Sequence, residues 1–359
     1  MIEKSSRIAT FDVAKALVML LVVGGHIQGN GIVANANEWC DPYFGNLTVG
    51  LDMPLFFMIS GYFSVNSIRN GSWGRIVART IGFLWPVAAF GVIFGAIIGL
   101  TGTKPLWKVL LYPVARVAFG DWFLLTIAIM YFSCAVLMRI GRSELQRLLL
   151  IAVFYVALFF APRWIPFHWT SNVMHMLPYF VFGMFVLRPF ELHKKSWVAV
   201  PAGLFFVGTV LLEGDVNVNG MSFYNVTTDW HVTLTDGYLL LCFWARTLVG
   251  ISGAIYALWL LDKLCANISI MGRMAPLGTT TLGVYVMHQW PLVQIKEFGL
   301  MTSPFAGYWK WPFALALFLF CHYITLGLKR SRLLNSVFFC NEKWLSECID
   351  GVGCKSNVA

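Results

Sequence analysis

The stretch FDVAKALVMLLVVGGH, residues 11–26, decides the fold class. With its flanks it reaches the roughly 20 mostly apolar residues that a spanning helix needs, yet it carries Asp12, Lys15 and His26. Its length and these charges distinguish it from the apolar core of a cleavable signal peptide. Ionisable side chains inside a spanning helix are costly and usually face the interior of a helix bundle. The stretch therefore predicts an all-α membrane protein with a polar interior.

Composition supports this class over the whole chain. Of its 359 residues, 58% are hydrophobic and only 12% are charged, against a usual ~25% charged. So few charges cannot cover a soluble domain, and 30 Phe, 15 Trp and 32 Gly suit lipid-facing surfaces and close helix packing. The composition disfavours a disordered chain, a disulfide-rich secreted module and a soluble nucleic-acid-binding protein. The eight cysteines form no CxxC pair and are expected to be free thiols.

Ten segments are predicted to span the membrane, and 1–330 is predicted to be one transmembrane domain, followed by a short cytoplasmic tail, 331–359. The stretch 104–119 is broken by prolines and is expected to lie on the membrane or re-enter it. The ten predicted spans are 10–29, 48–66, 76–100, 121–139, 148–162, 173–188, 197–212, 236–261, 275–293 and 312–328.

The distribution of basic residues predicts the orientation. With ten spans and both termini cytoplasmic, 18 of the 26 Lys and Arg residues lie in cytoplasmic segments, six lie outside, and Lys15 and Arg246 fall within spans. Lys and Arg collect in cytoplasmic loops of membrane proteins, so this split is self-consistent, and an odd number of spans would destroy it. The net charge of +9 is therefore interpreted as topological, without a nucleic-acid partner.

The charged residues of the first predicted helix share one face. Lys15 and His26 are eleven residues apart, which places them about 20° apart around a helix and about 16 Å apart along it. Asp12 falls within about 40° of the same face. One polar stripe should therefore point into the bundle. Lys15 snorkelling at the helix end and a hydrogen-bonded core histidine at His26 are the alternative interpretations.

A second group lies at the predicted cytoplasmic surface. Ser60 and Tyr62 end the motif MPLFFMISGY, residues 53–62. Arg75 and Arg79 follow at spacing i, i+4, so they share a helix face that suits anionic phosphates. Positive-inside anchoring is the alternative explanation of these two arginines.

A third group lies in the outer half of the predicted bundle, where Asp52 could meet His26 at matching depth. Each member could be packing or an interfacial anchor, but together they describe a polar interior open to the outside. The remaining members are Asp121, Trp122, Arg246, Tyr285 and His288.

In these motifs the chain resembles the acyltransferase 3 family of integral membrane acyltransferases, in particular its fucose 4-O-acetylase-like branch. The resemblance rests on a basic residue ten residues before a histidine (Lys15, His26), FFxxSGY (56–62), RxxxR (75–79), S/T-L-x-x-Y-x-x-H (281–288) and, more weakly, WFL at 122–124. Two departures stand out. Lys15 replaces the Arg of many members and loses the bidentate fork, and Asp52 stands where this branch often has His.

The resemblance implies transfer of an acyl group from cytoplasmic acyl-CoA, with acetyl-CoA expected, to a hydroxyl, often of a carbohydrate, presented outside. The donor phosphates would bind near Lys15, Arg75 and Arg79, beside Ser60 and Tyr62. His26 would act as general base or transient acyl carrier, oriented by Asp12 or Asp52. Direct transfer and an acyl-enzyme route both stay open, as do acetyl and succinyl donors. Substrate-binding residues would be Asp121, Trp122, Arg246, Tyr285 and His288.

Two other functions compete with this interpretation. A multi-pass transporter or exporter of a small anionic or sugar-linked solute could line its path with Lys15, Arg246 and His26, and would give flux without acyl-CoA turnover. A lipid-linked sugar transferase would need a metal-binding acidic pair, and no DxD pair occurs. The seven histidines contain no i, i+4 pair, so no metal is expected. The predicted location is the cell membrane.

Overall fold

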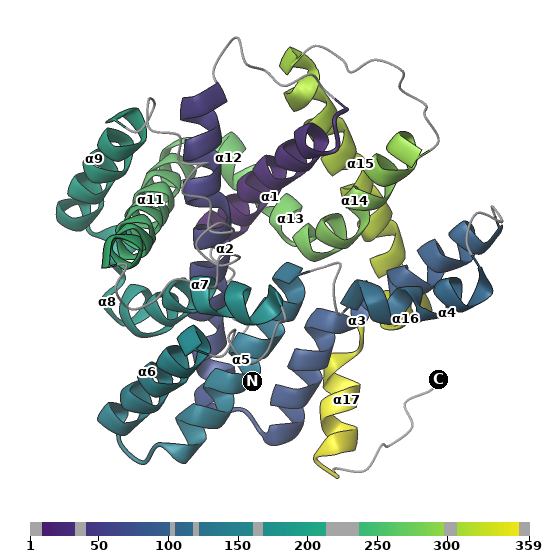
Figure 1. Cartoon of the computed structure of the whole chain (residues 1–359), viewed down its shortest axis with the longest axis horizontal. Helices are drawn as coiled ribbons and strands as arrows, with labels where there is room; N and C mark the ends of the chain where they lie inside the picture. Colours follow the sequence, from purple (N-terminus) through teal and green to yellow (C-terminus); the bar gives the residue numbers. More distant parts are fainter. Residues whose placement is uncertain are drawn as a thin grey trace. The chain divides into compact units, whose positions relative to one another are not determined.

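A computed structural model of the chain describes residues 9–32, 41–100, 105–117, 122–160, 168–212, 237–297 and 307–351 (Figure 1). Over these ranges the protein is helical and contains no strand, which confirms the all-α prediction. The chain forms two compact units, unit 1 from residues 1–59 and 185–326, and unit 2 from residues 60–184 and 327–359.

Unit 1 is built around α1 (Ala9–Gly29), which packs against α11, α12, α13 and α14. Many of its apolar residues are buried, and Phe11, Met19 and Val23 are fully buried. α9 lies along α11, as Figure 1 shows. The other elements of unit 1 are the first part of α2 (Asp41–Asn70), α8 (Arg188–Phe190), η4 (Leu192–Lys194), α9 (Ser196–Leu212), α11 (Gly237–Asn267), α12 (Ser269–Arg273), α13 (Ala275–Gly278), α14 (Thr281–Glu297), η5 (Gly307–Trp309) and most of α15 (Lys310–Arg330).

The contact between α1 and α13 depends on a glycine. A Cβ atom on Gly278, the last residue of α13, would collide with the carbonyl oxygen of Asp12 in α1. Small residues allow helix backbones to approach this closely in membrane proteins. Gly278 therefore sets how near α13 lies to the first turns of α1.

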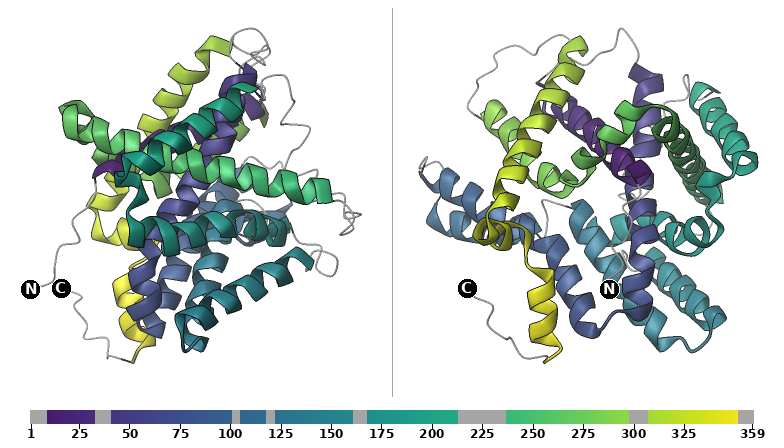
Figure 2. Two further views of the ribbon diagram at one scale, coloured as in Figure 1. Left: turned by 90° about the vertical axis from the view of Figure 1, so that its left-hand side faces the viewer. Right: turned by 180° about the vertical axis from the view of Figure 1, so that it is seen from behind.

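Unit 2 is built around α3 (Trp73–Leu100), which packs against α4, α5, α16 and α17. α5 also packs against α6 and α7. Both views of Figure 2 show α17, in yellow, beside α3, in blue. The other elements of unit 2 are the second part of α2, α4 (Leu106–Ala115), α5 (Trp122–Ile140), α6 (Glu144–Phe160), α7 (His168–Phe182), α16 (Arg332–Phe339) and α17 (Glu342–Ile349), and the π-helix η3 (Gly183–Leu187) runs from unit 2 into unit 1.

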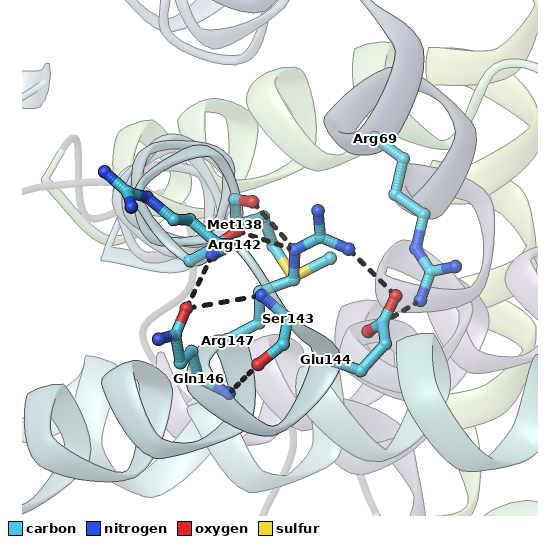
Figure 3. Close-up of polar contacts among 8 residues, drawn as sticks. Arg69, Met138, Arg142, Ser143, Glu144, Gln146 and Arg147 are labelled. Atoms are coloured by element: carbon cyan, nitrogen blue, oxygen red, sulfur yellow. Dashed lines mark hydrogen bonds and ion pairs between the residues drawn. The ribbon is translucent and has the colours of Figure 1, made fainter.

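A polar network closes the turn between α5 and α6 (Figure 3). Glu144 pairs with Arg147 at 2.9 Å and with Arg69 of α2 at 3.4 Å. The Ser143 hydroxyl accepts a hydrogen bond from the backbone N–H of Gln146 at 3.2 Å and so caps α6. Arg69 and Arg147, which belong to predicted cytoplasmic segments, therefore hold helices together.

The structure confirms a helical chain with several candidate membrane spans, but it does not confirm the predicted number of ten. Four predicted spans, 48–66, 148–162, 197–212 and 275–293, overlap described helices that do not meet both the length and the hydropathy needed to cross a membrane. α6, α9 and α14 have 17 residues each, about 25 Å at 1.5 Å per residue. Among the described residues, six helices meet both criteria: Ala9–Gly29, Trp73–Leu100, Trp122–Ile140, Asn172–Phe190, Phe243–Asn267 and Gly307–Arg330.

Two segments differ from their sequence-based description. The predicted helix 275–293 is divided at Thr279 and Thr280, whose hydroxyls donate to the carbonyls of Pro276 and Leu277 and end α13 there. The segment treated above only as a tail contains α16 and α17, and both pack on α3. In the stretch 104–119, α4 has only ten residues, as expected for a piece too broken to span.

Candidate functional site

Unit 1 brings two histidines together that are 262 residues apart in the chain. His26 of α1 and His288 of α14 face each other, with their rings 4.9 Å apart between centroids. His26 Nδ1 lies 3.2 Å from His288 Nε2 and 2.9 Å from the side-chain nitrogen of Gln289. We call His26, His288 and Gln289 the histidine cluster.

Backbone carbonyls fix the orientation of His288. Its Nδ1 lies 2.7 Å from the Tyr285 carbonyl oxygen and 3.1 Å from that of Val284. Carbonyl oxygens only accept hydrogen bonds, so His288 Nδ1 carries a hydrogen and its Nε2 is directed at His26. His288 is 0% exposed, whereas His26 is half-buried. His26 is therefore the imidazole of the pair that a substrate can reach.

The surroundings of His26 are open on one side and cationic nearby. Gly25 is exposed, and a Cβ atom on it would meet nothing within 4 Å. Two residues after His26, the Gln28 side-chain oxygen accepts a hydrogen bond of 2.6 Å from Lys310 Nζ of α15. Lys310 is only 9% exposed. A ligand beside His26 would thus have free space and a buried ammonium group close along the helix.

Asp12 and Lys15 form an ion pair of 2.6 Å at the start of α1. Asp12 lies fourteen residues before His26, about 21 Å along the helix axis. Asp12 therefore does not orient His26, which corrects that part of the sequence-based prediction. The shared helix face was predicted from angles, but the axial distance prevents direct contact.

Asp52 of α2 is stabilised by groups other than His26. Its carboxylate accepts a 2.6 Å hydrogen bond from the Met53 backbone N–H, and Arg246 of α11 acts on its charge. Arg246 therefore contributes to the electrostatic surroundings of Asp52, and the role of Asp52 beside His26 stays a prediction.

Unit 2 contains Arg75 and Arg79 in the first two turns of α3, and we call this pair the arginine face. The Arg75 side chain is exposed. The Arg79 guanidinium lies 5.5 Å from the ring centroid of Tyr131 in α5 and 6.0 Å from that of Phe83. These cation–π contacts position Arg79 against the neighbouring helix.

Each of these arginines is faced by a carboxylate of α17 or its C-terminal end. Asp350 accepts hydrogen bonds from the Ser72 hydroxyl and from the Gly74 backbone N–H, the latter at 2.8 Å, and these bonds lower the pKa of Asp350, with Arg75 adding a smaller effect. Desolvation raises the pKa of Glu342, and Arg79 opposes that rise. Two acidic residues of α17 and its C-terminal end, Glu342 and Asp350, therefore lie within electrostatic range of the arginine face.

Comparison with known proteins matches residues 8–329 to the acyltransferase 3 family, described as an acyltransferase domain. The chain belongs to the acyltransferase 3 family. This confirms the resemblance drawn from the motifs above. The match covers nearly the whole chain, which is a membrane protein with several apolar helices.

This acyltransferase is also similar to two curated relatives. It is 38% identical over 85 residues to Nodulation protein NolL of Sinorhizobium fredii, covering 23% of either chain. It is 26% identical over 189 residues to Nodulation protein NolL of Mesorhizobium japonicum, covering 52% of this chain and 49% of that protein. The chain thus spans about half or less of the length of these relatives. No solved structure matches it significantly.

The other predicted site residues of the acyltransferase are placed separately. Ser60 and Tyr62 lie in the part of α2 that belongs to unit 2, and Tyr62 is buried with its ring 5.2 Å from that of Phe63. Trp122 opens α5, and Asp121 lies outside the described residues.

Sequence reasoning missed several residues that the structure places in these clusters. Gln289 directly follows His288, but nothing in its spacing indicated that it would reach His26. Lys310, within the aromatic run YWKW, was counted only as an outer loop charge. Glu342 and Asp350 had no signal, because their roles depend on the packing of α17 on α3.

Proposed function

We propose that this acyltransferase transfers an acyl group, with acetyl expected, from cytoplasmic acyl-CoA to a hydroxyl of a carbohydrate or glycoconjugate on the outer side of the cell membrane. The proposal includes ten spans with both termini cytoplasmic, the arrangement in which 18 of 26 basic residues face the cytoplasm.

The arrangement of His26 carries the proposal. Its ring is reachable, and its Nδ1 is occupied by His288 and Gln289, which leaves Nε2 for a substrate. An imidazole in this position can accept the proton of a hydroxyl as that oxygen attacks a thioester carbonyl. It can also attack the carbonyl itself and carry the acyl group, so both routes are part of the test.

The arginine face supports binding of the donor phosphates. Arg75 and Arg79 lie in the first two turns of α3, where the helix dipole favours anions. The Asp350 carboxylate at the Gly74 N–H is an example of an anion bound there. Within unit 1, an acyl chain extending from Lys15 to His26 would have to cover about 16 Å along α1.

The decisive experiment supplies membranes containing the protein with labelled acetyl-CoA and separately with succinyl-CoA. Surface glycans and lipid-linked sugars are then compared by mass spectrometry in cells with and without the protein. We expect new O-acyl groups that depend on the protein. An unchanged acyl inventory with solute flux would instead support a transporter. Acyl-protein trapped by rapid quenching and lost in His26→Ala would favour the acyl-enzyme route.

The orientation has its own test in intact cells. The proposal places Cys40, which lies outside the described residues, in the first outer loop, and the exposed Cys348 of α17 in the cytoplasm. A membrane-impermeant thiol reagent should label Cys40 and leave Cys348 unlabelled until the cells are opened. The reverse pattern would place the donor site on the wrong side of the membrane.

A further inference from the structure

The contact between His26 and His288 requires a proton between two ring nitrogens. The hydrogen on His288 Nδ1 is committed to the carbonyls of Val284 and Tyr285, so a neutral His288 presents only a lone pair at Nε2. That lone pair faces His26 Nδ1 at 3.2 Å. Two lone pairs at this distance would repel each other, so one of the two nitrogens must carry a hydrogen.

Gln289 can form a hydrogen bond with His26 Nδ1 whether the proton lies on that atom or on His288 Nε2. Its side-chain amide lies 2.9 Å from the same His26 Nδ1. An amide offers an N–H donor or, after a half-turn of its last torsion, a carbonyl acceptor. It can therefore accept from His26 Nδ1 when that atom is protonated, and donate to it when the proton has moved to His288.

The two carboxylates predicted to orient His26 have other neighbours. Asp12 is paired with Lys15, and Asp52 accepts a hydrogen bond from the Met53 N–H. The group behind His26 is instead a fully buried imidazole anchored on backbone carbonyls. Carbonyl dipoles directed at Nδ1 stabilise a positive charge on that ring.

We propose that His26 and His288 form a proton relay in which His288 stores the proton that His26 takes from the acceptor hydroxyl, while Gln289 follows the proton position. This inference rests on the proposed acyl transfer. It makes His26 the group that touches substrate and gives His288 a role behind it, in place of direct acceptor binding.

The relay balances every proton. The acceptor O–H bond breaks and its proton joins His26 Nε2, while the hydrogen of His26 Nδ1 passes to His288 Nε2. The hydroxyl oxygen forms a bond to the thioester carbonyl carbon, and the C–S bond breaks. The proton then returns from His288 to His26 Nδ1, and His26 Nε2–H protonates the departing thiolate. The products are the acyl ester and free CoA thiol, and both histidines are neutral again.

Substitution of His288 by Gln separates a relay from simple hydrogen-bonded support. Gln can accept a hydrogen bond from His26 Nδ1 but cannot take up the proton. We expect His288→Gln to lower kcat by about 10²-fold or more, within the range for lost proton transfer, with KM changed only a few-fold. Gln289→Leu should lower kcat less, because the two imidazoles remain.

His322→Gln is the matched control. His322 is also a buried imidazole of unit 1, bonded at 2.6 Å to Thr280 Oγ1 and placed outside the histidine cluster. We expect it to keep the wild-type kcat per folded molecule. If wild type transfers acyl groups and folded His288→Gln has the same kcat, the relay is overturned and the acyltransferase proposal stays intact. A wild-type protein without acyl transfer would instead overturn the proposed function.

A spectroscopic measurement tests the proton positions without using activity. Protein labelled with ¹⁵N-histidine, assigned through the His26→Ala and His288→Gln variants, should show a hydrogen on Nδ1 of both histidines in the resting state. A coupling across the hydrogen bond should join His26 Nδ1 to His288 Nε2. A neutral His26 protonated only at Nε2 would contradict the relay.

Discussion

The arginine face and the histidine cluster are assembled in different ways. Arg75 and Arg79 are four residues apart on one helix, so α3 alone places them on one face. His26 acquires its partners from α14, more than 260 residues away. Two basic side chains can form an anion-binding face at a helix end through their spacing along one helix alone. An imidazole that handles protons in an apolar bundle needs a second group, and only packing can supply it.

The two clusters also differ in what occupies them. The arginine face is met by Glu342 and Asp350, carboxylates that a donor phosphate would have to displace or share. The histidine cluster is met by neutral groups and has open space beside Gly25. We therefore expect changes in the histidine cluster to affect turnover, and changes at the arginine face to affect donor affinity.

The largest effect is expected for His26→Ala. Loss of general-base assistance should reduce acyl transfer by about 10²–10⁴-fold, since alanine can neither accept a proton nor attack a thioester. Alanine favours helix, so membrane insertion should survive. The measurement is turnover per correctly folded molecule, with His26→Gln as a second variant. If both variants transfer acyl groups within a few-fold of wild type, His26 is structural and the contrast between the clusters disappears.

Changing both arginines should have the next largest effect. Hydrogen bonds to charged groups contribute about 1.5–3 kcal/mol, so Arg75→Gln with Arg79→Gln should weaken CoA binding by at least about tenfold. The matched control is Arg142→Gln with Arg332→Gln, which removes the same charge from exposed positions of unit 2. Isothermal titration with CoA compares the pairs. Equal affinities in the two double variants would reduce Arg75 and Arg79 to topological anchors.

A smaller effect is expected from a methyl group at the contact of α1 and α13. Gly278→Ala should destabilise the protein by about 1–3 kcal/mol, because the new Cβ collides with the Asp12 backbone. Gly272→Ala, in α12, meets nothing within 4 Å and should be neutral or slightly stabilising. Thermal unfolding in detergent distinguishes them. Equal melting temperatures for Gly278→Ala and Gly272→Ala would mean that the close contact between α13 and α1 contributes little to the position of Asp12 and Lys15.

The smallest effect concerns the carboxylate at the arginine face. The pKa of Asp350 is lowered, so its contribution to docking of α17 is present above the ordinary aspartate pKa and is lost as pH falls through the lowered value. Asp350→Asn should lower the hydrogen-exchange protection factors of α17 at neutral pH and raise CoA affinity a few-fold. Wild type should approach those lower protection factors only at acid pH.

Glu347→Gln on the same helix is the control for Asp350→Asn, since Glu347 pairs with Lys343 within α17. It removes the same charge and should leave both exchange and CoA affinity near wild type. Identical behaviour of Asp350→Asn and Glu347→Gln would show that net charge sets the exchange of α17 and the CoA affinity. The specific contacts of Asp350 with Ser72 and Gly74 would then have no effect of their own.

Much of the candidate site could be predicted because its residues lie in short motifs on single helices. The spacing of Lys15 and His26 and that of Arg75 and Arg79 follow from helix periodicity alone. The Asp12–Lys15 ion pair is also local, although its distance from His26 along α1 was overlooked. Gln289, Lys310 and Asp350 could not be predicted in the same way, because their partners come from other helices.

The sequence by itself determined that the chain is a helical membrane protein and to which family it belongs. Apolar content, helix-length segments and short motifs indicate these properties, and they depend only on residues near one another in the chain. Only the tertiary structure decided that, among the described residues, His288 and Gln289 lie against His26, and that α17 returns to the start of α3. The physical reason is that a buried polar group must be satisfied by some partner, but periodicity does not specify which helix provides it.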